Sequence, residues 1–593
     1  MKKSSLLALA IVAAAFAGSL PLQAQWQTQS ILVKPGWSAI YLHVDAGYDK
    51  LDDLVGADLT NPISQLWLWQ PSASTIQYVT GPQAPVTSST EWVPWRRITT
   101  GMSSTLTRLV PNGAYLVFST ATTNYMWTLK GKPVAPSYTW ATTGENFLGF
   151  PTPPSLPPTF DHFLSLGGSL ESLAQIYAYQ GGDLTSSNPA PVQFFTSTLV
   201  NRGQAYWIRA GTYYNNYFGP FTATPQDLVG VDFGDSSSQC TLRLMNPTAN
   251  PVTVTMQLLP SESAPTNQPD YANVPPVLVR GALITSNLSY GFTNLTVNNT
   301  VSWTLPPQGQ NGSSQAIVLG LNRYTMSGAP GTLYGGILKL TDSYGLSEVD
   351  LPVSAQVASY AGLWVGEATV SQVQAYLKSF QRDGNNNPVM DTNGAYIVTG
   401  IDTNLGPTSS AFPLRLIVHN DGSHAYLLQR VFYGSDPGSN IIVTTSEAFL
   451  DPAQLGAARR ITAVHLPWTP NNTAYSLGGP LTPGALLSTT VTTTYDDQSS
   501  NPFLHTYHPD HDNLDATFQV QLAPGQESYG ISRAITLNIT PPGNDFNSLT
   551  QAGQSFSGAY TEAITMTGAG TRVFNVGGAF SLNRVSAIAT LTH

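Results

Sequence analysis

The densest group of side chains that could bind a metal ion lies between residues 505 and 513. Its potential ligands are His505, His508, Asp510, His511 and Asp512. Neutral histidine nitrogens and carboxylate oxygens suit zinc, whereas aspartate and asparagine oxygens alone suit calcium better. Because Pro509 cannot donate to a sheet ladder, we expect the preceding strand to stop there and the following loop to carry the ligands. A divalent metal held there could activate a water molecule for hydrolysis.

The same residues also have a structural explanation. Aspartate and asparagine side chains accept hydrogen bonds from their own backbone in tight turns, and the histidines would then be exposed or packed. The sequence leaves both explanations open: a metal-assisted secreted hydrolase that uses this loop, or turn chemistry.

A second acidic segment, residues 383–394, is only superficially similar to a calcium-binding loop. Its sixth position is Pro388, where that motif has glycine, and its twelfth is Gly394, where a bidentate glutamate is required. Turn chemistry therefore explains this segment better than calcium binding.

Tryptophans near the N-terminus are the candidates for ligand binding. Exposed tryptophan rings can stack on sugars or anchor a partner protein. Trp92 and Trp95 fall in a segment that we interpret as an inserted loop, so we expect them to be exposed. Trp37 and one of Trp67 or Trp69 are expected to fill the core.

Common catalytic motifs are absent from the sequence, including the serine-hydrolase elbow, the zinc-protease helix motif, the phosphate loop and the dinucleotide fingerprint. Carboxylate pairs that cleave glycosides leave no local signature, and Glu367 and Glu562 are the first to inspect. We therefore expect a non-catalytic protein with a structural, adhesive, or glycan- or protein-binding role, with the metal-assisted hydrolase as the alternative.

The N-terminal region that contains the tryptophans has an internal repeat. Three landmarks recur in order: residues 36–42 as 144–150, residues 66–69 as 176–179, and residues 112–117 as 202–208. Each landmark is a short apolar or aromatic run bounded by Gly, Pro or Asn, which predicts a buried β-strand. Between the first two landmarks, helical spacing predicts one short helix in each copy.

The repeat resembles a module of exported bacterial proteins that begins with "GWN" and closes with a "GxAYWI" strand. The second copy departs from it at Glu145, where the module has tryptophan. The C-terminal region is similar to that of uncharacterised exported bacterial proteins with a "YxPDHDN" turn. The resemblance implies a structural or surface-associated module, and it supplies no catalytic residues.

The whole chain is predicted to be all-β and mainly antiparallel, with several β-sandwich or β-barrel-like domains in tandem and a few short helices. Lys2 and Lys3, followed by an apolar run too short to span a membrane, predict a signal peptide. The predicted layout is a signal peptide at 1–24, the repeats at 25–135 and 136–224, an Ig-like sandwich at 225–358 and a C-terminal β domain at 359–593.

The composition of the chain limits the classes of partner and the cell compartments that we expect. Charged residues make up 10% of the chain and the net charge is −10, so nucleic acid is an unexpected partner. The single cysteine, Cys240, excludes an intramolecular disulfide and is expected to be a small buried hydrophobe. We expect an extracellular or outer-surface protein, with the periplasm as the alternative, and no transmembrane segment after cleavage. Its expected partners are surface glycans or other cell-envelope proteins, and the sequence indicates no oligomeric state.

Metal content separates the two explanations of the 505–513 loop. If it binds zinc or calcium, mass spectrometry of the purified mature chain will find stoichiometric metal, and changing His508, His511 and Asp512 to Ala will remove it with the ligands. If the loop is a turn, neither protein will contain metal.

Overall fold

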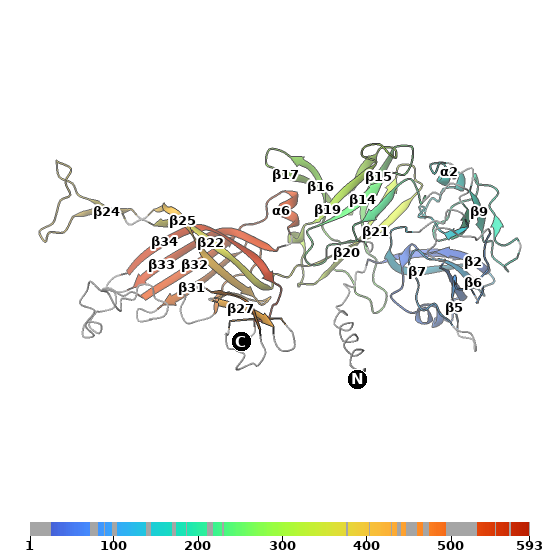
Figure 1. The fold of residues 1–593 in the computed structure, drawn as a ribbon, viewed down its shortest axis with the longest axis horizontal. Helices are drawn as coiled ribbons and strands as arrows, with labels where there is room; N and C mark the ends of the chain where they lie inside the picture. Colours follow the sequence, from blue (N-terminus) through green and yellow to red (C-terminus); the bar gives the residue numbers. More distant parts are fainter. Residues whose placement is uncertain are drawn as a thin grey trace, which may run out of the picture. The chain divides into compact units, whose positions relative to one another are not determined.

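The computed structural model describes residues 25–591 except 71–80, 88, 98–103, 138–143, 169–173, 186, 210–216, 228–229, 375–376, 403, 429, 436–440, 446–458, 466–473, 494–529, 552 and 568–570. The chain forms two compact units, Met1–Ala358 with Asp545–Ala552, and Ser359–Asn544 with Gly553–His593. The predicted all-β, mainly antiparallel class is confirmed (Figure 1). Within the described residues, no helix is long and apolar enough to cross a membrane.

The first unit begins with two sheets that pack face to face. A three-stranded sheet has the order β1-β7-β3 and a four-stranded sheet has the order β2-β6-β4-β5. Their bounds are β1 Gln27–Val33, β2 Gly36–Tyr41, β3 Val44–Asp45, β4 Ile63–Trp69, β5 Trp92–Arg96, β6 Ala114–Ser119 and β7 Tyr125–Pro133. Since side chains alternate along a strand, Tyr115 and Val117 of β6 enter the core between these two sheets. Ala114 and Leu116 point to the opposite face.

That opposite face is covered by a third sheet, of order β10-β9-β11-β8. Its strands are β8 Asn146–Leu148, β9 Gln175–Ala178, β10 Ala190–Pro191 and β11 Tyr206–Arg209. Trp69 of β4 and Trp207 of β11 meet with ring centroids 5.1 Å apart, and Phe147 stacks on Trp207 at 4.6 Å. The β2-β6-β4-β5 sheet is therefore the middle of three layers and is buried on both faces.

Short helical elements occur where the sequence predicts them. The π-helical turn η1, Asp52–Gly56, precedes β4, and helix α2, Phe160–Leu164, precedes β9. Thr159 caps α2, since its side chain accepts a hydrogen bond from the backbone N–H of His162. Phe160, Phe163 and Leu164 are buried, so this helix closes one side of the aromatic core.

Residues 222–356 form a β-sandwich. One sheet has the order β12-β14-β19-β16-β17 and the other β13-β21-β20-β15-β18. The bounds are β12 Thr222–Pro225, β13 Val231–Asp232, β14 Gln239–Met245, β15 Val252–Pro260, β16 Val277–Ile284, β17 Ser289–Leu295, β18 Thr300–Leu305, β19 Ser314–Leu321, 3-10 helix η2 Arg323–Thr325, β20 Leu333–Asp342 and β21 Glu348–Gln356. Alternate residues of β15, such as Val252 and Val254, are buried between the sheets. Cys240 is buried there too, as expected from the sequence.

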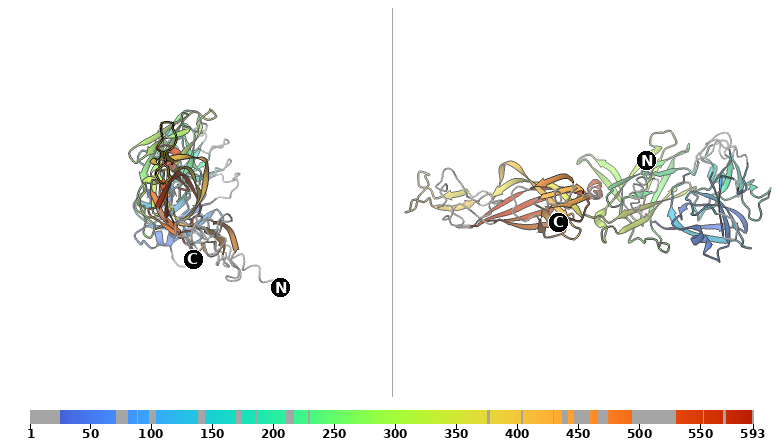
Figure 2. Two further views of the ribbon diagram at one scale, coloured as in Figure 1. Left: turned by 90° about the vertical axis from the view of Figure 1, so that its left-hand side faces the viewer. Right: turned by 60° about the horizontal axis from the view of Figure 1, so that its bottom comes forward.

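The second unit is built on an eight-stranded sheet of order β30-β26-β25-β22-β34-β33-β32-β31 (Figures 1 and 2). Its strands are β22 Gly362–Gln374, β25 Leu405–Asn420, β26 Ala425–Leu428, β30 Ala474–Leu477, β31 Leu486–Thr493, β32 Gly530–Ile539, β33 Ser555–Thr567 and β34 Thr571–Ser586. The sheet curls until its outer strands meet at a bridge between Gly478 and Ser488. Trp364, Tyr560 and Phe580 lie in the core that it encloses.

Two smaller sheets complete this unit. One has the order β28-β27-β29, with β27 Arg430–Ser435, β28 Ile441–Thr444 and β29 Arg459–His465. The other is a pair, β23 Leu377–Phe380 and β24 Val398–Asp402.

Helix α6, Phe546–Thr550, follows β32 of the second unit but packs in the first unit. Asp545 caps it by accepting the backbone N–H of Ser548 at 3.1 Å. Phe546 and Thr550 are fully buried. A Cβ added at Gly320 of β19 would lie 2.2 Å from Thr550, so this contact requires glycine. The chain consequently passes between the units three times.

We predict that Phe546→Ala lowers the free energy of unfolding of the first unit by about 3–5 kcal/mol, because it empties a filled site against β19. Denaturation followed by tryptophan fluorescence measures this change. The control is Phe194→Ala, whose side chain is 69% exposed and whose removal should change the value by less than about 0.5 kcal/mol. Equal losses in the two variants would contradict a stabilising role for α6.

Candidate functional site

The predicted metal ligands cannot be placed. His505, His508, Asp510, His511 and Asp512 all lie outside the described residues, as does the predicted signal peptide. Within the part of the chain that the structure describes, no group of three or more His, Cys, Asp or Glu side chains is arranged to hold a metal ion. The 505–513 loop stays a prediction.

The expectation that Trp92 and Trp95 are exposed is wrong. They are 4% and 1% exposed, because the segment that we interpreted as a loop forms β5, the fourth strand of the middle sheet. The two rings point to opposite faces: Trp92 lies 4.8 Å from Trp69, and the indole N–H of Trp95 donates to Asp52 at 2.8 Å. Rings buried in this way cannot stack on a sugar without opening the core.

The two glutamates considered for glycoside cleavage do not form a pair. Glu367 lies opposite Ser581, and Glu562 opposite Val576, on either side of β34. Five positions along a strand correspond to about 17 Å, whereas catalytic carboxylates lie about 5–10 Å apart. Glu562 is also 4% exposed and already accepts hydrogen bonds from Arg533 and from the Tyr560 hydroxyl. It is a structural carboxylate.

The acidic segment 383–394 is held by turn chemistry, as the sequence indicates. Asp383 accepts the backbone N–H groups of Asn385 and Asn387, each at 2.9 Å. Asp391 repeats this pattern eight residues later with Asn393 and Ala395. The hydrogen bonds from Asn387 and Asn385 hold the pKa of Asp383 below its usual value.

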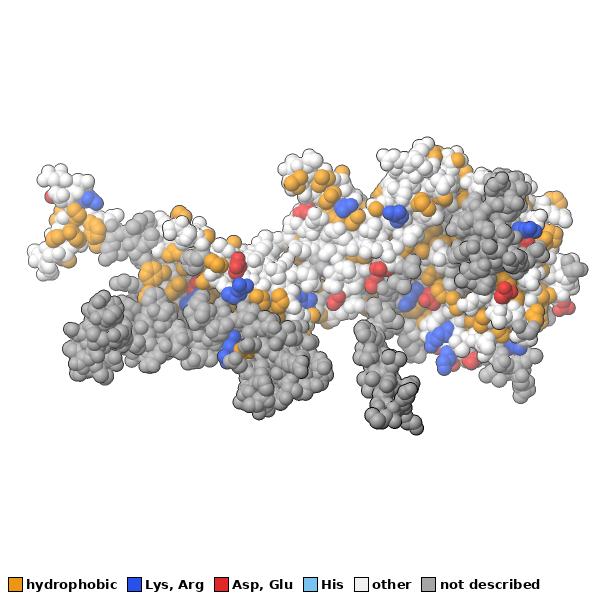
Figure 3. Space-filling view, in the orientation of Figure 1, with side chains coloured by type: hydrophobic (Ala, Val, Ile, Leu, Met, Phe, Trp, Pro, Cys, Tyr) orange, Lys and Arg blue, Asp and Glu red, His pale blue; other side chains and the backbone are white. Residues whose placement is uncertain are grey.

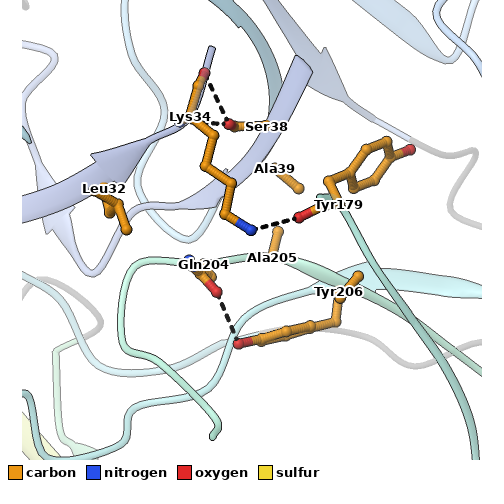
Figure 4. A pocket seen from close by; sticks show the side chains of 9 residues that line it. Leu32, Lys34, Ser38, Ala39, Tyr179, Gln204, Ala205 and Tyr206 are labelled. Carbon is orange, nitrogen blue, oxygen red and sulfur yellow. Dashed lines mark hydrogen bonds between the residues drawn. The ribbon is translucent and has the colours of Figure 1, made fainter. Parts of the chain in front are cut away.

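A small recess lies between the segment of β1 and β2 and the segments of β9 and β11 (Figure 4). The ammonium group of Lys34 donates to the carbonyl of Tyr179 at 3.2 Å, and the Tyr206 hydroxyl donates to Gln204 at 3.2 Å. Burial lowers the pKa of Lys34. The recess has room for roughly one water molecule, which is too little for an organic ligand.

A cluster of ion pairs joins Arg202 to strands β20 and β21 of the sandwich. Arg202 pairs with Asp350 at 2.7 Å and donates to the carbonyl of Glu348 at 2.8 Å. Lys339 pairs with the Glu348 carboxylate at 2.7 Å, and Gln27 of β1 donates to Asp350 at 3.0 Å. Each carboxylate is therefore balanced by a cation, as burial of a charge requires.

Glu145 is a buried carboxylate without a hydrogen bond, and sequence reasoning did not select it. It is 1% exposed, and neither of its oxygens has a hydrogen-bond partner. Burial raises its pKa to about 7, although the charge of Arg209 acts in the opposite direction. The signal in the sequence was a glutamate in place of the tryptophan expected at the start of the module.

Comparison with known proteins assigns no family. No family model and no curated protein matches the chain. Among solved structures, it is similar to the E. coli chaperone DraB at 11% identity over 43% of this chain and 91% of that chain, and to the Pseudomonas aeruginosa CupB2 chaperone at 8% over 40% and 100%. It is also similar to native E. coli alpha-2-macroglobulin at 9% over 96% and 45%. The TM-score is 0.14 in all three cases, so these similarities give no information about function.

We predict that Glu145 makes the first unit less stable as pH rises. Its pKa in the folded state lies above its ordinary value of 4.5, so its contribution is complete below pH 4.5 and is lost as pH rises to about 7. Glu145→Gln should remove this dependence and raise the free energy of unfolding at pH 8 by about 1–3 kcal/mol.

Urea denaturation between pH 4.5 and 8 measures this effect. Asp235→Asn, which neutralises an exposed carboxyl of the same unit, is the control and should leave the pH profile unchanged. A Glu145→Gln profile parallel to that of the wild type would show that Glu145 does not titrate in this range.

Proposed function

We propose that this chain is an exported, non-catalytic protein that binds other proteins of the cell envelope through a projecting arm. The arm is residues 377–402, which include β23 and β24. Figure 1 shows it extending beyond the eight-stranded sheet of its own unit. The observation that carries the proposal is the exposure of apolar side chains on this arm.

The arm is braced by its own backbone. Gln381 donates to the carbonyl of Ile397 at 2.9 Å, Ile397 to that of Val389 at 2.9 Å, and Val389 to that of Gln381 at 2.8 Å. This cycle joins three short segments, and the turns between them are those held by Asp383 and Asp391. A segment fixed in this way loses little conformational entropy when it binds, which favours recognition.

Apolar side chains of the arm are left in water. Met390, Tyr396 and Val398 are 52%, 49% and 41% exposed, and the ring of Tyr396 lies 5.4 Å from that of Phe380 (Figure 3). Clustered exposed apolar groups on a protein surface are typical of protein-binding sites. Since Trp92 and Trp95 are buried, a protein partner is better supported here than a glycan.

We further propose that residues 25–224 are a tandem repeat that serves as a rigid structural base. The strands at the three landmarks, β2, β4 and β6, match β8, β9 and β11. If β5 is taken to correspond to β10, the two sheets have the same strand order. Tyr115 and Tyr206 support this match, because each hydroxyl bonds to the backbone five residues earlier, at Val110 and Asn201.

Binding of the purified mature chain to washed cell envelopes tests the proposed role of the arm. We expect the triple variant Met390→Ser, Tyr396→Ser, Val398→Ser to bind at least about tenfold more weakly, because it removes the apolar contact area. The control changes three exposed apolar residues of the other unit, Leu59, Leu156 and Phe194, to Ser. The proposal fails if the arm variant, with an unchanged melting temperature, binds as well as the wild type.

A further inference from the structure

Two outer strands of the sandwich lack the residues that usually protect the edge of a sheet. Its sheets end on one side in the short strands β12, which contains Pro225, and β13, which has two residues. They end on the other side in β17 and β18, of seven and six residues. Proteins usually block such edges with charges, prolines or short strands. Residues 281–305, which contain β17 and β18, have no charged residue and no proline.

The β16–β17 hairpin extends this open edge past the core. Val277, Leu278 and Val279 are buried, whereas the remaining five residues of β16 are exposed. In β17 only Leu295 is buried, and the six residues before it are half-buried or exposed. Helix α6 packs beside Gly320 of β19, which lies opposite Leu278 at the buried end of β16, so the tip of the hairpin lies farther from this helix.

Apolar side chains gather at the tip. Leu283, Ile284 and Leu288 are 46%, 44% and 77% exposed. Leu288 also has a φ of 54°, in the left-handed region that leucine rarely adopts. The nearest charge on the hairpin, Arg280, lies over the ring of Tyr290 at 4.7 Å. An exposed leucine in a strained backbone conformation does not stabilise the fold of a single chain.

We propose that two copies of this chain associate by antiparallel pairing of β17 with β17. Such a pairing is self-complementary about a two-fold axis, so one uncharged strand serves both copies. It also brings together the part of an acidic chain that lacks acidic side chains, which keeps the repulsion between copies low. This proposal is independent of the arm and concerns a different unit.

The register of the pairing follows from the exposed residues. If the two-fold axis passes near Phe292, residue 289 of one copy faces residue 295 of the other. Leu288 of each copy then approaches Val297 of its partner, a second apolar residue that is 40% exposed. The pairing would cover both exposed apolar ends of the edge at once.

Sedimentation velocity of the full mature chain from about 1 to about 100 μM tests the proposal. The expected result is a dimer whose dissociation constant rises at least about tenfold in Thr293→Lys, which puts a charge on the edge. The control is Thr255→Lys on β15, where the strand is paired on both sides by Ser302 and Thr341. This control should leave the dimer intact.

Leu288→Asn is a second test variant that is expected to fold, since asparagine tolerates the left-handed region better than leucine. It should keep or raise the melting temperature and still weaken the dimer by removing the contact with Val297. A wild-type chain that stays monomeric throughout this range overturns the proposal. So does a dimer that neither Thr293→Lys nor Leu288→Asn weakens.

Discussion

Burial of the middle sheet on both faces is the constraint on which the first unit depends. Strands β4, β5 and β6 place alternate side chains in two different cores, one shared with β1 and β7 and one shared with β8, β9 and β11. Tight packing of this kind leaves little room for change, because core side chains interlock at crystal-like density. The ring contacts of Trp69, Trp92 and Trp207 add about 0.5–1.5 kcal/mol each beyond their burial. The three sheets between residues 27 and 209 are thus joined through two shared cores.

Two arginines hold segments of backbone together through several hydrogen bonds each. Arg97 donates to the carbonyls of Val55, Gly56, Asp58, Asn61 and Ile63, which lie at the end of η1 and in the segment that leads into β4. Arg323 does the same for Phe233, Gly234, Ser237 and Gln356 in the sandwich. Buried carbonyl groups need donors, and one guanidinium supplies up to five. A chain with few charges and many loops can be held together in this way.

Strands were predictable from the sequence because alternation and bounding turns are local properties. The run through Val252 and Val254 alternates as a half-buried strand must, and the Asp383 and Asp391 turns follow from side-chain chemistry alone. Trp92 and Trp95 were misjudged because the sequence comparison found no counterpart of their segment in the second predicted copy, and the segment was therefore taken for a loop. Its inclusion in the middle sheet depends on pairing with β4, a contact that no local pattern reveals. The burial of Glu145 and the placement of α6 are likewise tertiary outcomes.

The return of the chain to the first unit at α6 limits where recombination can divide the gene without damaging the fold. A gene segment that ends at residue 358 would encode the strands of the first unit without the helix that fills the site beside Gly320. A segment that begins at 359 would carry that helix away from the sheet it packs on. Simple end-to-end fusion or exchange at this boundary would therefore leave a defect in both products, and recombination should preserve the two units as a pair.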